Sequence, residues 1–133
     1  MKKTFSKSWN SSTQPRKQRK FRFNAPLATK GKFLSVNLSK ELRKKYGTRS
    51  LRARVGDKVK VIRGKFKGRE GNIEEVDIRK TKIYISKLEV TKKEGAKIRV
   101  PLNPSNLQII ELKLDDKKRK AKLAKLAPKT EAK

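Results

Sequence analysis

The stretch of residues 54–77 limits the possible fold more than any other part of the chain. Residues 58–63 alternate between basic and apolar side chains, apart from Ile62, as a strand with one buried face does. A basic turn follows, and residues 72–77 then read as a second strand. The pattern predicts two strands joined by a turn whose glycines permit positive φ and close approach of the backbone to a ligand. These predicted structural glycines are Gly64, Gly68 and Gly71.

Further short strands follow this pair. Residues 82–86, 89–91, 97–100 and 107–112 are rich in Ile, Val, Tyr and Leu, and residues 92–96 read as a hairpin loop. Closely spaced short strands are typical of small barrels. We therefore expect a mainly β fold, with a small antiparallel barrel over residues 55–112.

The charge of the chain indicates its class of partner. Its 133 residues include 40 Lys and Arg but only 12 Asp and Glu, which gives a formal net charge of +28. Residues 1–54 carry 17 basic residues and one acidic residue, whereas residues 55–112 are closer to balance with 14 and eight. A compact protein with this excess needs a polyanion as counter-charge, and nucleic acid supplies one through its phosphates.

Other classes of function fit the composition poorly. The chain has no His and no Cys, so the commonest general bases, thiol nucleophiles and zinc ligands are missing. We expect no enzyme activity, no catalytic residue, no metal site, no cofactor and no small-molecule substrate. No run of about 18 apolar residues occurs, and no apolar stretch follows the N-terminus, so we expect neither membrane insertion nor a secretory signal.

One enzymatic alternative, a magnesium-dependent ribonuclease, would need clustered carboxylates. Charge balance on the sheet surface is the simpler interpretation, because nothing in the sequence places two of the acidic residues in one cleft. The candidates are Asp57, Glu70, Glu74, Glu75 and Asp77.

The first segment, residues 1–54, reads as a basic extension. Residues 1–20 offer little apolar surface, and we expect them to be disordered until an anion holds them. Trp9 is a candidate for stacking on a base or docking on a protein, and Phe21, Phe23, Pro26 and Leu27 form an irregular apolar patch that would dock on the domain or on a partner. The cations predicted to neutralise phosphates are Arg16, Lys17, Arg19, Lys20 and Arg22.

Two short helices are predicted outside the barrel. Ser39 suits an N-cap and Gly47 suits the position after a helix, which predicts a helix near residues 39–46. The last segment, residues 113–133, reads as a basic tail that is partly helical. Asp115 and Asp116 stand at its predicted helix N-terminus, and Leu123 and Leu126 form a thin apolar stripe. We expect this tail to be solvated or to lie along RNA.

The turn between the first two strands is the predicted centre of RNA binding. Basic side chains around an aromatic ring suit unpaired bases and phosphates. The ring of Phe66 has two possible roles, a contact with RNA or a plug over the open end of the barrel. The predicted contacts are Arg63, Lys65, Phe66, Lys67 and Arg69.

Residues 54–77 resemble a KOW motif, the strand–loop–strand unit of SH3-like barrels in ribosomal and transcription proteins, with Gly71 at the motif's defining glycine. The surrounding blocks are similar to the archaeal and eukaryotic type of the universal large-subunit ribosomal protein twenty-four family, numbered twenty-six in eukaryotes. The resemblance spans about residues 14–118. These blocks are Pro15-Arg16-Lys17-Gln18-Arg19-Lys20, Asn24-Ala25-Pro26-Leu27, residues 38–47, Arg49-Ser50-Leu51 and Pro104-Ser105-Asn106.

The resemblance implies an SH3-like fold and a structural role in the large ribosomal subunit. It implies direct binding to the largest ribosomal RNA near its 5′ end, early action in subunit assembly, and a position near the peptide exit tunnel among other ribosomal proteins in the cytoplasm. Two alternatives use similar features. A KOW-type transcription elongation factor would normally need a further domain, and a DNA-architectural protein would have less use for the long basic extension.

Overall fold

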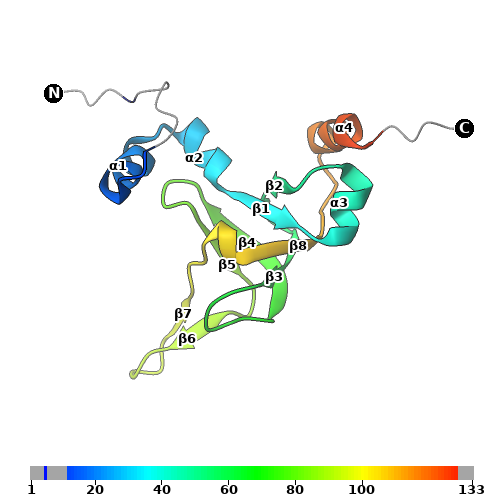
Figure 1. The fold of residues 1–133 in the computed structure, drawn as a ribbon. Coiled ribbons are helices and arrows are strands. Elements are labelled where there is room, and N and C mark those ends of the chain that lie inside the picture. The colour runs from blue at the N-terminus through cyan, green and yellow to red at the C-terminus, as the bar shows by residue number, and fades with distance from the viewer. Residues whose placement is uncertain (1–4, 6–11, 129–133) are drawn as a thin grey trace, which may run out of the picture.

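A computed structural model describes Phe5 and residues 12–128. The described part combines eight strands with four α-helices and one 3-10 helix (Figure 1). The helices are α1 (Pro15–Asn24), α2 (Leu27–Phe33), α3 (Lys40–Tyr46), η1 (Pro104–Asn106) and α4 (Lys117–Leu126). The strands are β1 (Ser35–Leu38), β2 (Ser50–Arg52), β3 (Lys58–Val61), β4 (Glu70–Asp77), β5 (Lys82–Ile85), β6 (Glu89–Thr91), β7 (Lys97–Arg99) and β8 (Leu107–Glu111).

Six strands form one sheet in the order β2-β1-β8-β3-β4-β5, and β6 and β7 form a separate hairpin. The predicted strands of residues 55–112 are all present, so the mainly β prediction is confirmed. In Figure 1 the β6–β7 hairpin extends away from the large sheet, at the end opposite the helices. Every residue of β6 and β7 is exposed, as expected of a ribbon with no second layer against it.

The sheet differs from the predicted antiparallel barrel in two respects. Strands β1 and β8 pair in parallel, which makes the sheet mixed. The sheet is also open, because β2 and β5 are its two edges and do not pair with each other. At the outer edge of β5, the pairing in the described structure is a single bridge between Ile83 and Leu102. Pro101 and Pro104 flank Leu102, and since proline has no N–H it cannot extend a ladder of hydrogen bonds there.

Strands β1 and β2 come from the segment predicted as an extension. Val36 and Leu38 of β1 are buried and alternate with less buried residues, so a period-two pattern is present in the sequence there too. The N–H of Ser39, just after β1, donates to the Ile109 carbonyl at 2.9 Å and extends the pairing with β8. The sheet thus takes in residues on both sides of position 54.

The core draws on all three predicted segments. Five of its 16 buried members precede residue 55, and Leu123 of α4 is also among them. A barrel made of residues 55–112 alone would not include these side chains in its core. A small domain is marginal in buried surface, so the added apolar groups contribute directly to its stability. The earlier members are Leu34, Val36, Leu38, Leu51 and Ala53.

Helix α3 has the predicted ends. The Ser39 hydroxyl accepts a hydrogen bond from the Leu42 N–H, and Gly47 adopts a left-handed conformation with φ +63°. The partly buried Leu42 and Tyr46 pack against the core, so one face of this helix docks on the domain.

Helix α1 is a correction to the prediction of disorder for residues 1–20, because residues 15–20 are helical. Pro15 occupies the first turn, where its missing N–H costs nothing, and Arg, Lys and Gln have good helix propensity. The helix stops before Ala25, whose extended ψ of 137° is the conformation that a following proline favours. No residue of α1 is buried, so the helix stands on the surface.

Within the described residues, no helix has both the length and the apolar character needed to cross a membrane.

Candidate nucleic-acid interface

The turn between β3 and β4 is closed by backbone hydrogen bonds. The Gly68 N–H donates to the Val61 carbonyl at 2.8 Å, and the Val61 N–H donates to the Arg69 carbonyl at 2.9 Å. Gly64 and Gly68 have φ angles of +98° and +86°, which strain any residue other than glycine. The turn is therefore held in one shape by its glycines and its hydrogen bonds.

Gly71 has a different role from the other two. Its φ is ordinary, but a Cβ there would lie 2.7 Å from Ile85 Cγ2 and 3.0 Å from the Ser86 carbonyl oxygen. Glycine at 71 lets β5 pack tightly beside β4 just after the turn. The sequence motif predicts a structural glycine at this position. The residue that leaves no room for a Cβ there, Ile85, comes 14 residues later and could not be inferred from the motif.

Four cations of the turn project into solvent. None of the four forms a salt bridge with any described residue. Their positive charge is therefore available to a partner, on a backbone that is already ordered. These exposed residues are Arg63, Lys65, Lys67 and Arg69.

Phe66 lies at the centre of the turn but points inward. It is 8% exposed and belongs to the hydrophobic core. The Arg69 guanidinium lies 5.3 Å from the centroid of its ring. The ring of Phe66 is therefore packed in the core and leaves little of its face for a base to stack on.

The five predicted cations of the N-terminal segment lie on one helix. All are exposed on α1, and none is in a salt bridge among the residues that the structure describes. They are Arg16, Lys17, Arg19, Lys20 and Arg22. Trp9, the other N-terminal candidate, lies outside the described residues.

The helical cations and the turn cations lie far apart. Lys30 of α2 donates through Nζ to the Arg79 carbonyl oxygen at 3.3 Å, so α2 meets the β4–β5 turn. The C-terminal end of α1 lies beside the same turn, because Arg22 and Phe23 line a pocket with it. The β3–β4 turn is at the other end of β4, whose eight residues span roughly 26 Å at about 3.3 Å per residue. Figure 1 shows the same separation. The structure thus presents two basic surfaces.

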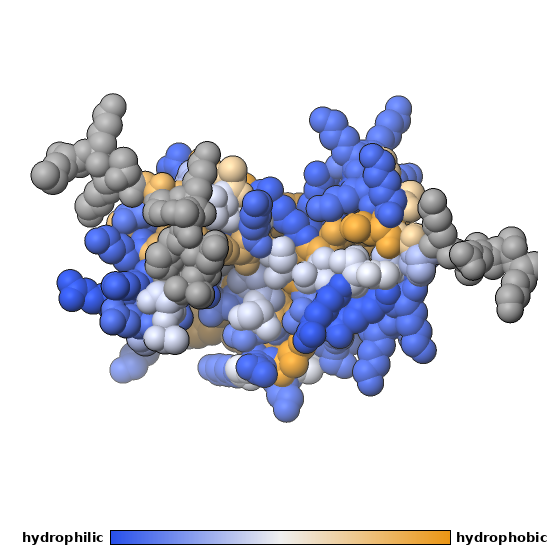
Figure 2. Space-filling view, turned by 45° about the horizontal axis from the view of Figure 1, so that its top comes forward, coloured by the Kyte–Doolittle hydropathy of each residue, from blue (hydrophilic) through white to orange (hydrophobic). Residues whose placement is uncertain are grey.

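The β4–β5 turn adds cations that the prediction did not include. Arg79 and Lys80 are exposed, and Lys82 begins the next strand. The sequence already shows a basic run, Arg79-Lys80-Thr81-Lys82, where two predicted strands meet. Only the fold shows that this run adjoins α1. Figure 2 draws one face of the molecule. Hydrophilic side chains project at both ends of that face, over α1 at one end and over α3 and α4 at the other.

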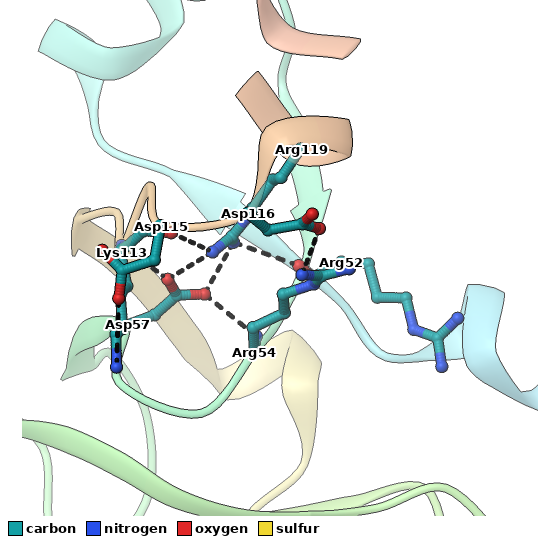
Figure 3. A network of polar contacts seen from close by, with 7 residues as sticks. All are labelled: Arg52, Arg54, Asp57, Lys113, Asp115, Asp116 and Arg119. Atoms are coloured by element: carbon teal, nitrogen blue, oxygen red, sulfur yellow. Dashed lines mark hydrogen bonds and ion pairs between the residues drawn. The ribbon is translucent and has the colours of Figure 1, made fainter. Parts of the chain in front are cut away.

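The C-terminal segment is fastened to the sheet by a buried ion pair (Figure 3). Both carboxylate oxygens of Asp57 accept hydrogen bonds from the Arg119 guanidinium, each at 2.7 Å. Asp57 is fully buried and Arg119 is 6% exposed. Arg119 also donates to the carbonyls of Lys113 at 2.9 Å and Arg52 at 3.3 Å. The tail was expected to be solvated or to lie along RNA, but its first half packs on the domain.

This pairing also corrects the interpretation of Asp57 as surface charge balance. Two of the other acidic candidates are paired with cations, Glu70 with Lys60 at 3.8 Å and Glu75 with Arg99 at 3.0 Å. In the described part of the chain, no three carboxylates gather into a group that could hold a metal ion.

Asp116 supports the same junction from outside the core. Its carboxylate accepts a hydrogen bond from the Lys118 N–H at 3.0 Å and caps α4. It also pairs with the Arg54 guanidinium. The hydrogen bond from Lys118 and the interaction with Arg54 lower the pKa of Asp116, so this cap is charged at neutral pH.

Comparisons with known proteins agree on one family. A family model that describes the eukaryotic ribosomal proteins L26 and their archaeal counterparts, numbered twenty-four, matches residues 12–125. Three curated archaeal proteins named large ribosomal subunit protein uL24 are similar to the chain. The one from Methanocorpusculum labreanum is 50% identical over 85% of this chain and 93% of its own length. Those from Methanoculleus marisnigri and Methanocella arvoryzae are 49% and 47% identical over 84% of this chain and 93% and 90% of their own lengths.

Proposed function

Since the chain belongs to the family of the eukaryotic ribosomal proteins L26 and their archaeal counterparts, we propose that it binds the largest ribosomal RNA directly, near the 5′ end of that RNA. It is a structural protein of the large ribosomal subunit and not an enzyme. Its action falls early in subunit assembly, its place in the cytoplasmic ribosome is near the peptide exit tunnel, and its other partners are neighbouring large-subunit proteins.

The observation that carries this proposal is the pair of basic surfaces on a rigid frame. The four cations of the β3–β4 turn and the five of α1 are exposed and lack salt bridges among the described residues. RNA duplexes hide their base edges in a narrow major groove, so a protein grips them through phosphates and shape. Two surfaces at opposite ends of β4 suit contact with two separate RNA segments.

The β3–β4 unit is the part to which we assign the KOW role. Its glycines shape the turn and Phe66 anchors it in the core, which orders the backbone that carries the four exposed cations Arg63, Lys65, Lys67 and Arg69. A preordered turn loses less conformational entropy on binding than a flexible one.

Reversing charge on the turn tests the proposal. We expect Lys65→Glu with Lys67→Glu to weaken binding to a transcript of the 5′ part of the largest ribosomal RNA by about tenfold or more, measured by filter binding. The side chains are exposed, so circular dichroism should remain that of the unchanged protein.

A matched control reverses two charges elsewhere. Lys92→Glu with Lys93→Glu, in the exposed loop of the β6–β7 hairpin, changes the net charge equally. Equal losses in both variants would show that net charge alone acts. A wild-type preference for a 3′ transcript of the same length would contradict the proposed 5′ position.

A further inference from the structure

A pocket lies where α1 meets the β4–β5 turn. Of the residues that were predicted to contact RNA, only Arg22 lines this pocket. Its volume is about 560 Å³, within the range of small-ligand sites. The contact between Lys30 Nζ and the Arg79 carbonyl joins its two sides. The turn is shaped in part by Asp77, whose carboxylate accepts a hydrogen bond from the Lys80 N–H at 3.0 Å.

The pocket is lined by cations and contains no acidic residue. None of these cations is in a salt bridge with a described residue, and the hydrogen bond of Lys82 to the neutral Asn103 amide leaves its charge uncompensated. Such a rim suits an anion and disfavours a basic or purely apolar protein surface. The cations are Arg22, Lys30, Arg79, Lys80 and Lys82.

Two aromatic rings lie among these charges. Phe23 at the end of α1 is 78% exposed, the most exposed large apolar side chain of the described residues. Tyr84 lines the pocket from β5, and the Arg99 guanidinium lies 5.4 Å from its ring centroid. A ring this exposed buries little apolar surface, so it contributes little to the stability of the fold. Bases stack on such rings, and this stacking works for every base because each has a π face.

We propose that this pocket takes one unstacked base of an RNA strand, with Phe23 as its stacking surface and the surrounding cations on the flanking phosphates. The inference rests on the proposed function, since it assumes an RNA partner. It adds a second contact, of a different kind from that of the turn: the β3–β4 turn binds phosphates and shape, whereas the pocket binds the face of a base.

Removing the ring tests the pocket. In filter binding to the transcript of the largest ribosomal RNA, we expect Phe23→Ala to weaken the affinity of the full chain about five- to tenfold, as loss of one stacked base does. Phe23→Tyr keeps a ring and should bind within about twofold of wild type. Leu27→Ala is the matched control, because Leu27 is a nearby apolar side chain, 56% exposed, that does not line the pocket.

A second measurement locates the base. The transcript is made with 4-thiouridine, irradiated with the wild-type protein and digested, and we expect crosslinked peptides that contain Phe23 or Tyr84. Unchanged affinity of Phe23→Ala, while Lys65→Glu with Lys67→Glu still loses binding, would overturn the pocket and leave the proposed function standing. If the wild-type protein does not bind the transcript, the proposed function itself fails. If Phe23→Ala binds RNA normally but enters large subunits poorly, Phe23 contacts a protein instead and the base pocket is rejected.

Discussion

Asp57 lies where the C-terminal segment meets the sheet, and its carboxylate accepts four hydrogen bonds there. Besides the two from Arg119, it accepts one from the Arg54 N–H at 3.0 Å and one from the Lys113 N–H at 2.9 Å. A buried carboxylate is tolerable only when its oxygens are satisfied in this way. The four donors come from the first and last of the three predicted segments and Asp57 itself from the middle one, so this one side chain joins all three.

Removing Arg119 should therefore be costly. We expect Arg119→Met to lower the free energy of unfolding by about 3–5 kcal/mol, because it leaves the buried Asp57 charge with two backbone N–H donors but no cation. Urea denaturation followed by circular dichroism measures the loss. The control is Arg54→Met, whose ion pair with Asp116 is exposed, so this variant should lose much less stability than Arg119→Met. Similar losses of stability in the two variants would show that the buried ion pair stabilises the fold no more than the exposed one does.

At the scale of elements, most helices and strands follow from local pattern, but what they pack on does not. The caps of α3 and the strands β3 to β8 could be read from short windows of sequence. Helix α4 was also indicated by Asp116 and its run of Lys, Ala and Leu. The docking of α4 on the sheet through Leu123 and Arg119 could not be predicted from the sequence, because Arg119 is 62 residues from its partner Asp57.

The start of α4 should respond to acid. The pKa of Asp116 is lowered in the folded protein, so its stabilising effect is complete above the pKa of an unfolded aspartate and is lost as the pH falls through the lower, folded value. Asp116→Asn keeps an N-cap acceptor but removes the charge. We expect the wild type to unfold at higher urea than this variant at about pH 7, and the difference to shrink as the pH falls below the pKa of an unfolded aspartate and to vanish once the folded carboxylate is protonated.

Thermal or urea unfolding at a series of pH values checks this expectation. Asp115→Asn serves as the control, since Asp115 is exposed and its ion pair with Lys113 lies outside the helix cap. A difference between wild type and Asp116→Asn that stays constant across the pH range would contradict the role of the ionised carboxylate.

For the whole molecule, the charge of +28 acts in opposite directions on folding and on binding. The cations repel one another in the free protein, and the described part contains only six salt bridges to offset this. Salt screens the repulsion, so the free protein should become more stable as salt rises. Binding to RNA should weaken, because salt reduces the gain from counterion release.

Both effects can be measured on the same protein. If six or more phosphates are neutralised, affinity for the ribosomal RNA transcript should fall at least about a thousandfold between about 50 and 200 mM monovalent salt. Over the same range the melting temperature of the free protein should rise. An affinity that does not change with salt would exclude phosphate contacts as the source of binding, whatever the stability does.

The sequence by itself indicated the class of partner and determined much of the local structure. Net charge needs no fold to be counted, and strands, caps and glycine turns depend on neighbours a few residues away. These signals, with the family resemblance, were enough to assign a ribosomal protein with a mainly β fold and a basic turn between β3 and β4.

Only the tertiary structure decided how distant residues combine. It turned Phe66 inward, made β1 a parallel partner of β8, paired Asp57 with Arg119 and brought Phe23 beside the β4–β5 turn. Each of these outcomes depends on a partner far away in the chain. Burial and ion pairing are properties of a three-dimensional environment, and a local pattern of residue types does not contain that environment.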